Sequence, residues 1–117
     1  MLNSLLIING KLVSASSTVR EDIAVSDGKI KDCGILEPNS FSGYEIIDVA
    51  GKLVFPGGID PHVHFALPTP AGNSCDDFRS GSIAALAGGT TSFIDFVTPR
   101  RGQSLLEALQ QRKAEAL

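Results

Sequence analysis

The residues of this sequence best suited to chemistry are its two histidines, His62 and His64. In a β-strand, residues two apart point to the same face, so we expect both imidazoles to project together. Two neutral imidazoles can bind one divalent cation of the zinc type. The spacing therefore predicts part of a metal site, and the alternative is a pair of exposed loop histidines without a ligand.

Two ligands do not complete such a site. A catalytic zinc usually has three protein ligands and an open position. Because the chain has no third histidine, we expect the remaining ligands to come from sequence outside it. Asp60 lies two residues before His62, on the same expected face of the strand.

The sequence pattern differs before and after Lys52. Before it, short β-prone runs alternate with tight turns, and Asn9-Gly10 and Asp27-Gly28 are two-residue hairpin signals. Residues 1–52 are therefore predicted to form part of a small β-sandwich or open sheet.

Residues 53–117 follow the order strand, helix, strand, helix. The apolar run Leu53–Phe55 is typical of a parallel strand that is buried on both faces. The later elements are marked by a helix start at Ser74 and Asp77, a stop at Gly88-Gly89, a strand at Thr90–Val97 and a capping box at Ser104 and Glu107.

This alternation predicts an α/β fold with a parallel sheet. Two βα units cannot close a barrel, because a complete (β/α)8 barrel takes about 250 residues. We therefore expect the 117 residues to be one segment of a longer polypeptide. In a barrel, His62 and His64 would lie at the carboxyl end of a strand, where active sites are built.

Composition excludes several classes of function. Hydrophobic residues make up 43% and charged residues 20% of the chain, which is ordinary for a globular protein. A net charge of −3 gives no basic face for nucleic acid or an anionic membrane. Leu5–Ile8 is too short to span a bilayer, and Cys33 and Cys75 favour free thiols in a reducing compartment. We therefore expect a cytoplasmic protein with neither nucleic acid nor membrane as partner.

Four blocks of the sequence form a longer pattern: Phe55-Pro-Gly-Gly-Ile-Asp-Pro-His-Val-His-Phe65, Asp76-Asp77-Phe78, Ala87-Gly-Gly-Thr-Thr91 and Ile94-Asp95-Phe96. This pattern resembles the cyclic amidohydrolases, and among them the dihydropyrimidinases and D-hydantoinases. The resemblance implies a distorted (β/α)8 barrel with a β-sandwich built from both termini. Residues 1–52 would be the first part of that sandwich, and residues 53–117 the first two βα units of the barrel.

The same resemblance implies roles for individual residues. His62 and His64 would bind the more buried of two divalent ions, expected to be Zn²⁺, in each full-length subunit. The other ligands (a carboxylated lysine, two further histidines and an aspartate) and the catalytic base would lie outside this chain. Phe65 and Leu67 would line the substrate pocket, with plain hydrophobic packing as the alternative for both. For Asp95, at the end of the second strand, a structural hydrogen bond is the expected role.

The implied reaction is the hydrolysis of a cyclic amide or imide, a dihydropyrimidine or a hydantoin, to an N-carbamoyl amino acid. The full-length protein would form a homotetramer, and the 117-residue chain alone is expected to be inactive. Ala66 stands where dihydroorotases usually carry an arginine, which counts against an acidic ring. The alternatives are an allantoinase-like hydrolase and a non-catalytic dihydropyrimidinase-related scaffold protein. Such scaffold proteins have lost the two histidines, so His62 and His64 argue for a metal-binding member.

Overall fold

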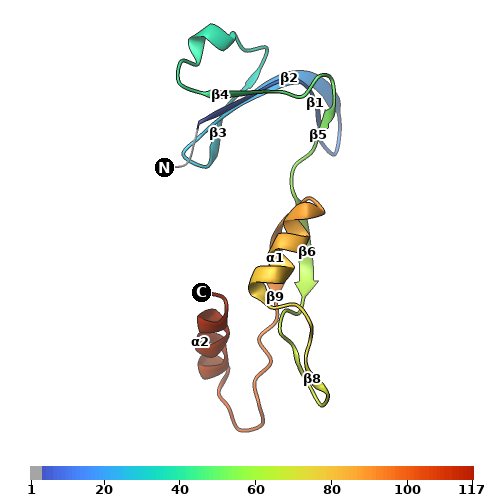
Figure 1. The fold of residues 1–117 in the computed structure, drawn as a ribbon, viewed down its shortest axis with the longest axis vertical. Helices are drawn as coiled ribbons and strands as arrows, with labels where there is room; N and C mark the ends of the chain where they lie inside the picture. The colour runs from blue at the N-terminus through green and yellow to red at the C-terminus, as the bar shows by residue number, and fades with distance from the viewer. Residues whose placement is uncertain (1–3) are drawn as a thin grey trace. The chain divides into compact units, whose positions relative to one another are not determined.

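The computed structural model describes residues 4–117 and contains two compact units, one ending at Pro56 and the other comprising Gly57–Leu117 (Figure 1). Each unit has strands of its own and is described by itself. Within residues 4–117, no helix combines the length and the apolar character needed to cross a membrane.

The first unit is one sheet with a short 3-10 helix. Its elements are β1 (Leu5–Val13), β2 (Thr18–Ser26), β3 (Lys29–Gly34), η1 (Pro38–Ser40), β4 (Glu45–Asp48) and β5 (Leu53–Val54). β1 is central: it pairs antiparallel with β2 and parallel with both β4 and β5, while β3 pairs with the other edge of β2. Leu6, Ile23 and Ala24 are the buried hydrophobic residues of this sheet.

The two hairpin signals behave differently in this sheet. At Asp27-Gly28 both residues have a positive φ, 54° and 70°, and they join β2 to β3 as predicted, because a type I′ turn needs both. The hairpin predicted at Asn9-Gly10 is wrong. There Asn9 has a φ of 60°, and β1 continues through a shift in register. The Asn9 N–H donates to Asp22 Oδ1 at 2.8 Å, so this site is a bulge in a continuous strand.

The apolar run Leu53–Phe55 was also placed wrongly from its sequence. Leu53 and Val54 form β5, which pairs with β1 in the first sheet. Leu53 is 56% exposed, so the run is not buried on both faces within the described residues. An apolar run indicates a strand but does not show which strand it pairs with. Here the pairing partners are Lys11 and Leu12, about forty residues earlier.

The second unit follows the predicted strand–helix–strand–helix order. Its elements are β6 (Gly58–Val63), β7 (Pro68–Thr69), β8 (Gly72–Asn73), α1 (Phe78–Ala87), β9 (Thr90–Asp95) and α2 (Leu105–Glu115). β6 and β9 are parallel neighbours and α1 connects them, while β7 and β8 form a small antiparallel hairpin (Figure 1). The α/β alternation inferred from the sequence is therefore confirmed for this unit.

Helix α1 begins three residues later than the sequence signature indicated. Asp77 is its N-cap: the carboxylate accepts the Ser80 N–H at 2.8 Å, and Ser80 Oγ accepts the Asp77 N–H at 3.1 Å. The Ser80 backbone hydrogen bond lowers the pKa of Asp77. Ser74 does not cap the helix, because its Oγ accepts the Leu67 N–H at 2.9 Å.

The other predicted helix ends are confirmed. Gly88 ends α1, and Gly89 follows it with a φ of 85°, the left-handed conformation that glycine adopts without strain. Ser104 caps α2, and its partner Glu107 completes the reciprocal pair of hydrogen bonds. The Ser104 backbone N–H also lowers the pKa of Glu107.

Candidate metal-binding site

The two histidines meet at the carboxyl end of β6. His62 lies in the strand and His64 directly follows its last residue, Val63. Their Nε2 atoms are 3.1 Å apart and their ring centroids 5.1 Å apart. Both side chains are exposed. The structure therefore brings the two imidazoles together on one side of the chain, where a common ligand can reach both.

This separation fits a metal of the zinc type. Two nitrogens at about 2.0–2.1 Å from one tetrahedral ion lie roughly 3.3–3.4 Å from each other. The observed 3.1 Å is within a few tenths of an ångström of that value. An imidazole pair at this distance can also share one hydrogen bond, because one Nε2 donates while the other accepts.

An aromatic ring from the neighbouring strand packs against both imidazoles. Phe96 directly follows β9, and its ring centroid lies 4.3 Å from that of His62 and 5.3 Å from that of His64. The ring limits how far the imidazoles can turn and covers part of their surface. Phe96 belonged to the family pattern in the sequence, but nothing in its type or spacing pointed to this contact.

Asp60 supports the strand end through the backbone. Its Oδ1 accepts the His62 N–H at 3.0 Å. This bond spans Pro61, which has no N–H of its own to donate. Asp60 therefore shapes the main chain that carries His62.

The residue after His64 is held by two side chains from other elements. The Phe65 N–H donates to Asp95 Oδ1 at 3.3 Å, and the Phe65 carbonyl accepts from the Arg112 guanidinium. Arg112, in α2, also binds both carboxylate oxygens of Asp95. The hydrogen bond to Asp95 raises the pKa of Arg112. Asp95 thus makes structural hydrogen bonds, as expected for it.

The Phe65 ring packs inside the second unit. It lies edge-on to Phe78 and Phe93, with centroids 5.5 Å and 4.8 Å away. A Cβ added to Gly81 in α1 would lie 2.1 Å from Phe65 Cε1, so the helix touches the ring closely. These contacts favour the packing alternative for Phe65, whose role as a pocket wall stays a prediction.

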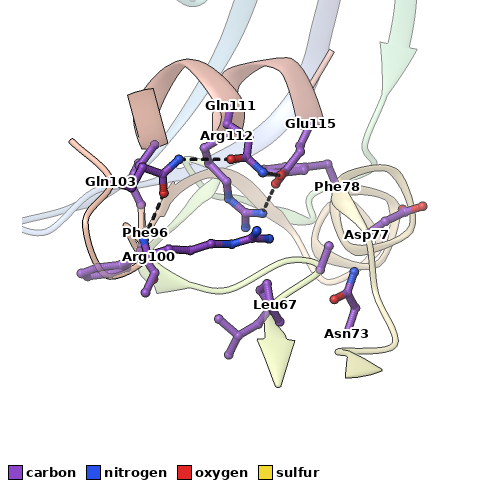
Figure 2. A pocket seen from close by; sticks show the side chains of 15 residues that line it. Leu67, Asn73, Asp77, Phe78, Phe96, Arg100, Gln103, Gln111, Arg112 and Glu115 are labelled. Atoms are coloured by element: carbon purple, nitrogen blue, oxygen red, sulfur yellow. Dashed lines mark hydrogen bonds and ion pairs between the residues drawn. The ribbon is translucent and has the colours of Figure 1, made fainter. Parts of the chain in front are cut away.

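Leu67 lies at a cavity of about 470 Å³. Its neighbours there include Asn73, Phe78, Phe96 and Arg112, and Figure 2 shows these side chains around the cavity. Phe96 is shared, since it lines the cavity and also packs against both imidazoles. The cavity therefore adjoins the histidine pair, and the contact of Leu67 with substrate stays a prediction.

The histidine pair has no further metal ligand close by in this part of the chain. Among residues 4–117, no group of three or more His, Cys, Asp or Glu side chains is arranged to hold a metal ion. Cys33 and Cys75 are both exposed free thiols. That the remaining ligands come from sequence outside this chain stays a prediction.

The comparison with protein families agrees with this arrangement. Residues 53–115, just over half of the 117-residue chain, match the Amidohydrolase family. The chain belongs to the amidohydrolase family. The matched segment contains the histidine pair, the strands β6 and β9, and both helices.

Individual relatives within this family confirm the resemblance seen in the sequence. The dihydropyrimidinase of Dictyostelium discoideum is 48% identical over 111 residues, which cover 94% of this chain and 22% of that protein. The dihydropyrimidinase of Rattus norvegicus is 47% identical over 109 residues, covering 91% and 21%. A crystal structure of a D-hydantoinase superposes with a TM-score of 0.90 at 42% identity, covering 97% of this chain and 24% of that one. The chain thus spans about a fifth to a quarter of the length of these relatives.

Proposed function

We propose that this chain is the first part of a metal-dependent hydrolase that opens a cyclic amide or imide ring, a dihydropyrimidine or a hydantoin, to an N-carbamoyl amino acid. The observation that carries the proposal is the meeting of the His62 and His64 Nε2 atoms at 3.1 Å beside Phe96. Membership of the amidohydrolase family and similarity to dihydropyrimidinases and a D-hydantoinase support the choice of reaction.

The proposal includes the barrel and the assembly that the sequence pattern implied. β6–α1–β9–α2 would be the first two βα units of a distorted (β/α)8 barrel, and the first sheet would be part of a β-sandwich. The active unit would be a homotetramer with two Zn²⁺ per full-length subunit. Two exposed free thiols fit the reducing compartment expected for it, the cytoplasm.

In the proposed site, His62 and His64 would hold a divalent ion through Nε2. Each ring must then carry its proton on Nδ1, and neither Nε2 is free to act as a base. Phe96 would keep the two rings from turning away, and Leu67 would form part of the wall beside the ring substrate. When bound, the divalent ions supply Lewis-acid activation of the ring carbonyl and of the attacking water.

Hydrolysis adds one water molecule across the ring amide. The hydroxyl joins the carbonyl carbon, the carbon–nitrogen bond breaks, and the ring nitrogen takes the proton. Asp60 and Asp95 both accept backbone N–H groups, so their hydrogen bonds serve to hold the chain. The base that transfers the proton would come from beyond these 117 residues.

The experiment uses the full-length protein and two variants, His62→Ala and His64→Ala. Zinc content is measured, together with the rates of ring opening of dihydrouracil and hydantoin before and after chelation. We expect each variant to lose activity by at least about a hundredfold, since removing even a residue behind a metal ligand costs about 10–100-fold. Cys33→Ser is the control. It removes an exposed thiol, which is also a side chain that can bind metals, from the first unit and not from the proposed site.

Three results would contradict parts of this proposal. A metal-loaded protein that turns over neither ring would favour the scaffold alternative. A marked preference for allantoin in the same panel would favour the allantoinase-like one. Full zinc content and activity in both histidine variants would remove the pair from the site altogether.

A further inference from the structure

We propose that Arg112 is a positioning residue for His64: together with Asp95 it fixes the main chain of Phe65 and thereby the imidazole beside it. This inference rests on the proposed metal-binding role of His64. It concerns a residue in α2 that lies 47 positions after Phe65 and does not touch the histidines through any hydrogen bond in the described residues.

Both backbone polar groups of Phe65 are used by this arrangement. Asp95 accepts the N–H, and Arg112 donates to the carbonyl. Adjacent Cα atoms are held about 3.8 Å apart by the planar peptide. A shift of Phe65 therefore moves His64, whose Nε2 must stay within a few tenths of an ångström of its place to bind a metal.

Arg112 and Asp95 are also linked to Phe96, just past the end of the neighbouring strand. Asp95 is the last residue of β9, and the next residue, Phe96, packs against both imidazoles. Arg112 binds both oxygens of Asp95. One guanidinium thus connects the residue after His64 with the residue before the aromatic ring that covers the pair.

The arrangement of these hydrogen-bond acceptors requires an arginine, and another cationic side chain would not replace it. Arg112 donates to Asp95 through Nε and one terminal nitrogen, and to the Phe65 carbonyl. It also donates to Glu115 Oε2 at 2.9 Å, the bond that Figure 2 shows. Its guanidinium carbon also lies 4.4 Å from the centroid of the Phe78 ring. A planar group with five N–H donors can meet these partners at once, whereas a lysine ammonium is a point charge.

The surroundings make these bonds costly to lose. The side chains of Arg112 and Asp95 are only 15% and 10% exposed. Removing the arginine would leave a largely buried carboxylate without its counter-charge and the Phe65 carbonyl without its donor. The chain can relieve both only by letting water in or by moving, and either change loosens the backbone that carries His64.

The test compares three variants of the full-length, zinc-loaded protein. Arg112→Met removes every N–H donor of the side chain, and Arg112→Lys keeps the positive charge but not the planar set of donors. Lys113→Met is the control. Lys113 is the next residue of the same helix and is exposed. The rate of zinc release to a chromogenic chelator is measured, with Tm of the metal-free protein and kcat and KM for ring opening.

We expect Arg112→Met to release zinc about 10–100-fold faster, as for the loss of a group that orients a ligand. Arg112→Lys should lie between it and the wild type, and Lys113→Met should match the wild type. Asp95→Asn and its combination with Arg112→Met are two further variants that complete a double-mutant cycle. Their effects on zinc release should be less than additive, because Arg112 and Asp95 act as a unit.

Zinc release at the wild-type rate in Arg112→Met, with only a lower Tm, would overturn the inference and leave an ordinary stabilising ion pair. If Arg112→Met does not fold, wild-type zinc release in Arg112→Lys overturns it equally. Failure of the proposed function gives a different result, because it appears without any change at Arg112: the wild-type protein opens neither ring, or His62→Ala and His64→Ala both keep full zinc content.

Discussion

At the scale of single residues, the candidate site depends on close contacts around Phe65. Its main chain is held by Asp95 and Arg112, and its ring is enclosed by Phe78, Phe93 and Gly81. Interiors packed in this way have little free volume to absorb an added atom. A substitution in α1 that displaces the Phe65 ring can therefore also displace His64, the preceding residue.

Gly81→Ala tests this packing. Alanine would improve helix propensity by about 1 kcal/mol, but its Cβ would lie 2.1 Å from Phe65 Cε1. Overpacking of this kind costs about 1–3 kcal/mol, and so deep an overlap belongs at the upper end. We expect a net loss of about 1–2 kcal/mol in the free energy of unfolding, measured by chemical denaturation of the full-length protein.

Gly88→Ala is the matched control, because a Cβ there would meet Ala85 O at an ordinary 3.5 Å. It should leave stability nearly unchanged. An unchanged or higher stability in Gly81→Ala would mean that the ring has room to move, contrary to the packing described.

At the level of the elements, the start of α1 depends on one capping carboxylate, that of Asp77. The Asp77 carboxylate accepts the Ser80 N–H at the exposed first turn. This bond favours the charged carboxylate and lowers its pKa below the ordinary value. The contribution of this cap to helix stability is therefore linked to pH.

The sign of this linkage follows from the direction of the shift. Because the pKa is lowered in the folded state, the cap stabilises fully above the ordinary aspartate pKa of about 3.9. The stabilisation is lost as the pH falls through the lower, folded value. Asp77→Asn should keep the capping hydrogen bond but should lose this contribution to the pH dependence of stability.

The measurement is Tm of the wild type and of Asp77→Asn from roughly pH 5 down to pH 2, with NMR titration of the Asp77 carboxyl. The two curves should diverge as the pH falls, with the wild type losing more. Glu37→Gln, an exposed carboxylate in the first unit, serves as control. Parallel curves for wild type and Asp77→Asn would contradict the assigned cap.

At the scale of the whole molecule, the second unit leaves much apolar surface uncovered. In the described residues β6 and β9 pair only with each other, so each has an open edge. Large apolar side chains are also exposed on both helices and both strands, namely Ile59, Ile83, Leu86, Ile94, Leu105 and Leu106. Open strand edges and large exposed apolar side chains both favour association with other chains.

We therefore expect the 117-residue polypeptide by itself to self-associate and to have no ring-opening activity. Light scattering should show a mass that rises with concentration. The double variant Ile83→Glu, Leu86→Glu should reduce this association, because it places charges on two exposed positions of α1. A monodisperse monomer at all concentrations, or hydrolysis by this polypeptide, would contradict the expectation.

Sequence patterns were enough to predict the features that depend on neighbours a few residues away. The type I′ turn at Asp27-Gly28, the end of α1 at Gly88 and the cap of α2 at Ser104 all form through bonds within one turn of chain. The convergence of His62 and His64 was also predicted from the alternation of side chains along a strand, although His64 itself lies just past the end of β6.

The features that join distant parts of the chain could be found only from the folded structure. The bulge at Asn9 depends on Asp22, the place of β5 depends on β1, and Phe65 depends on partners 30 and 47 residues away. Asn-Gly suits a bulge as well as a turn, and an arginine in a helix carries no sign of its partner. Local propensity limits what each segment can form, whereas long-range packing selects which of those forms exists and which side chains meet.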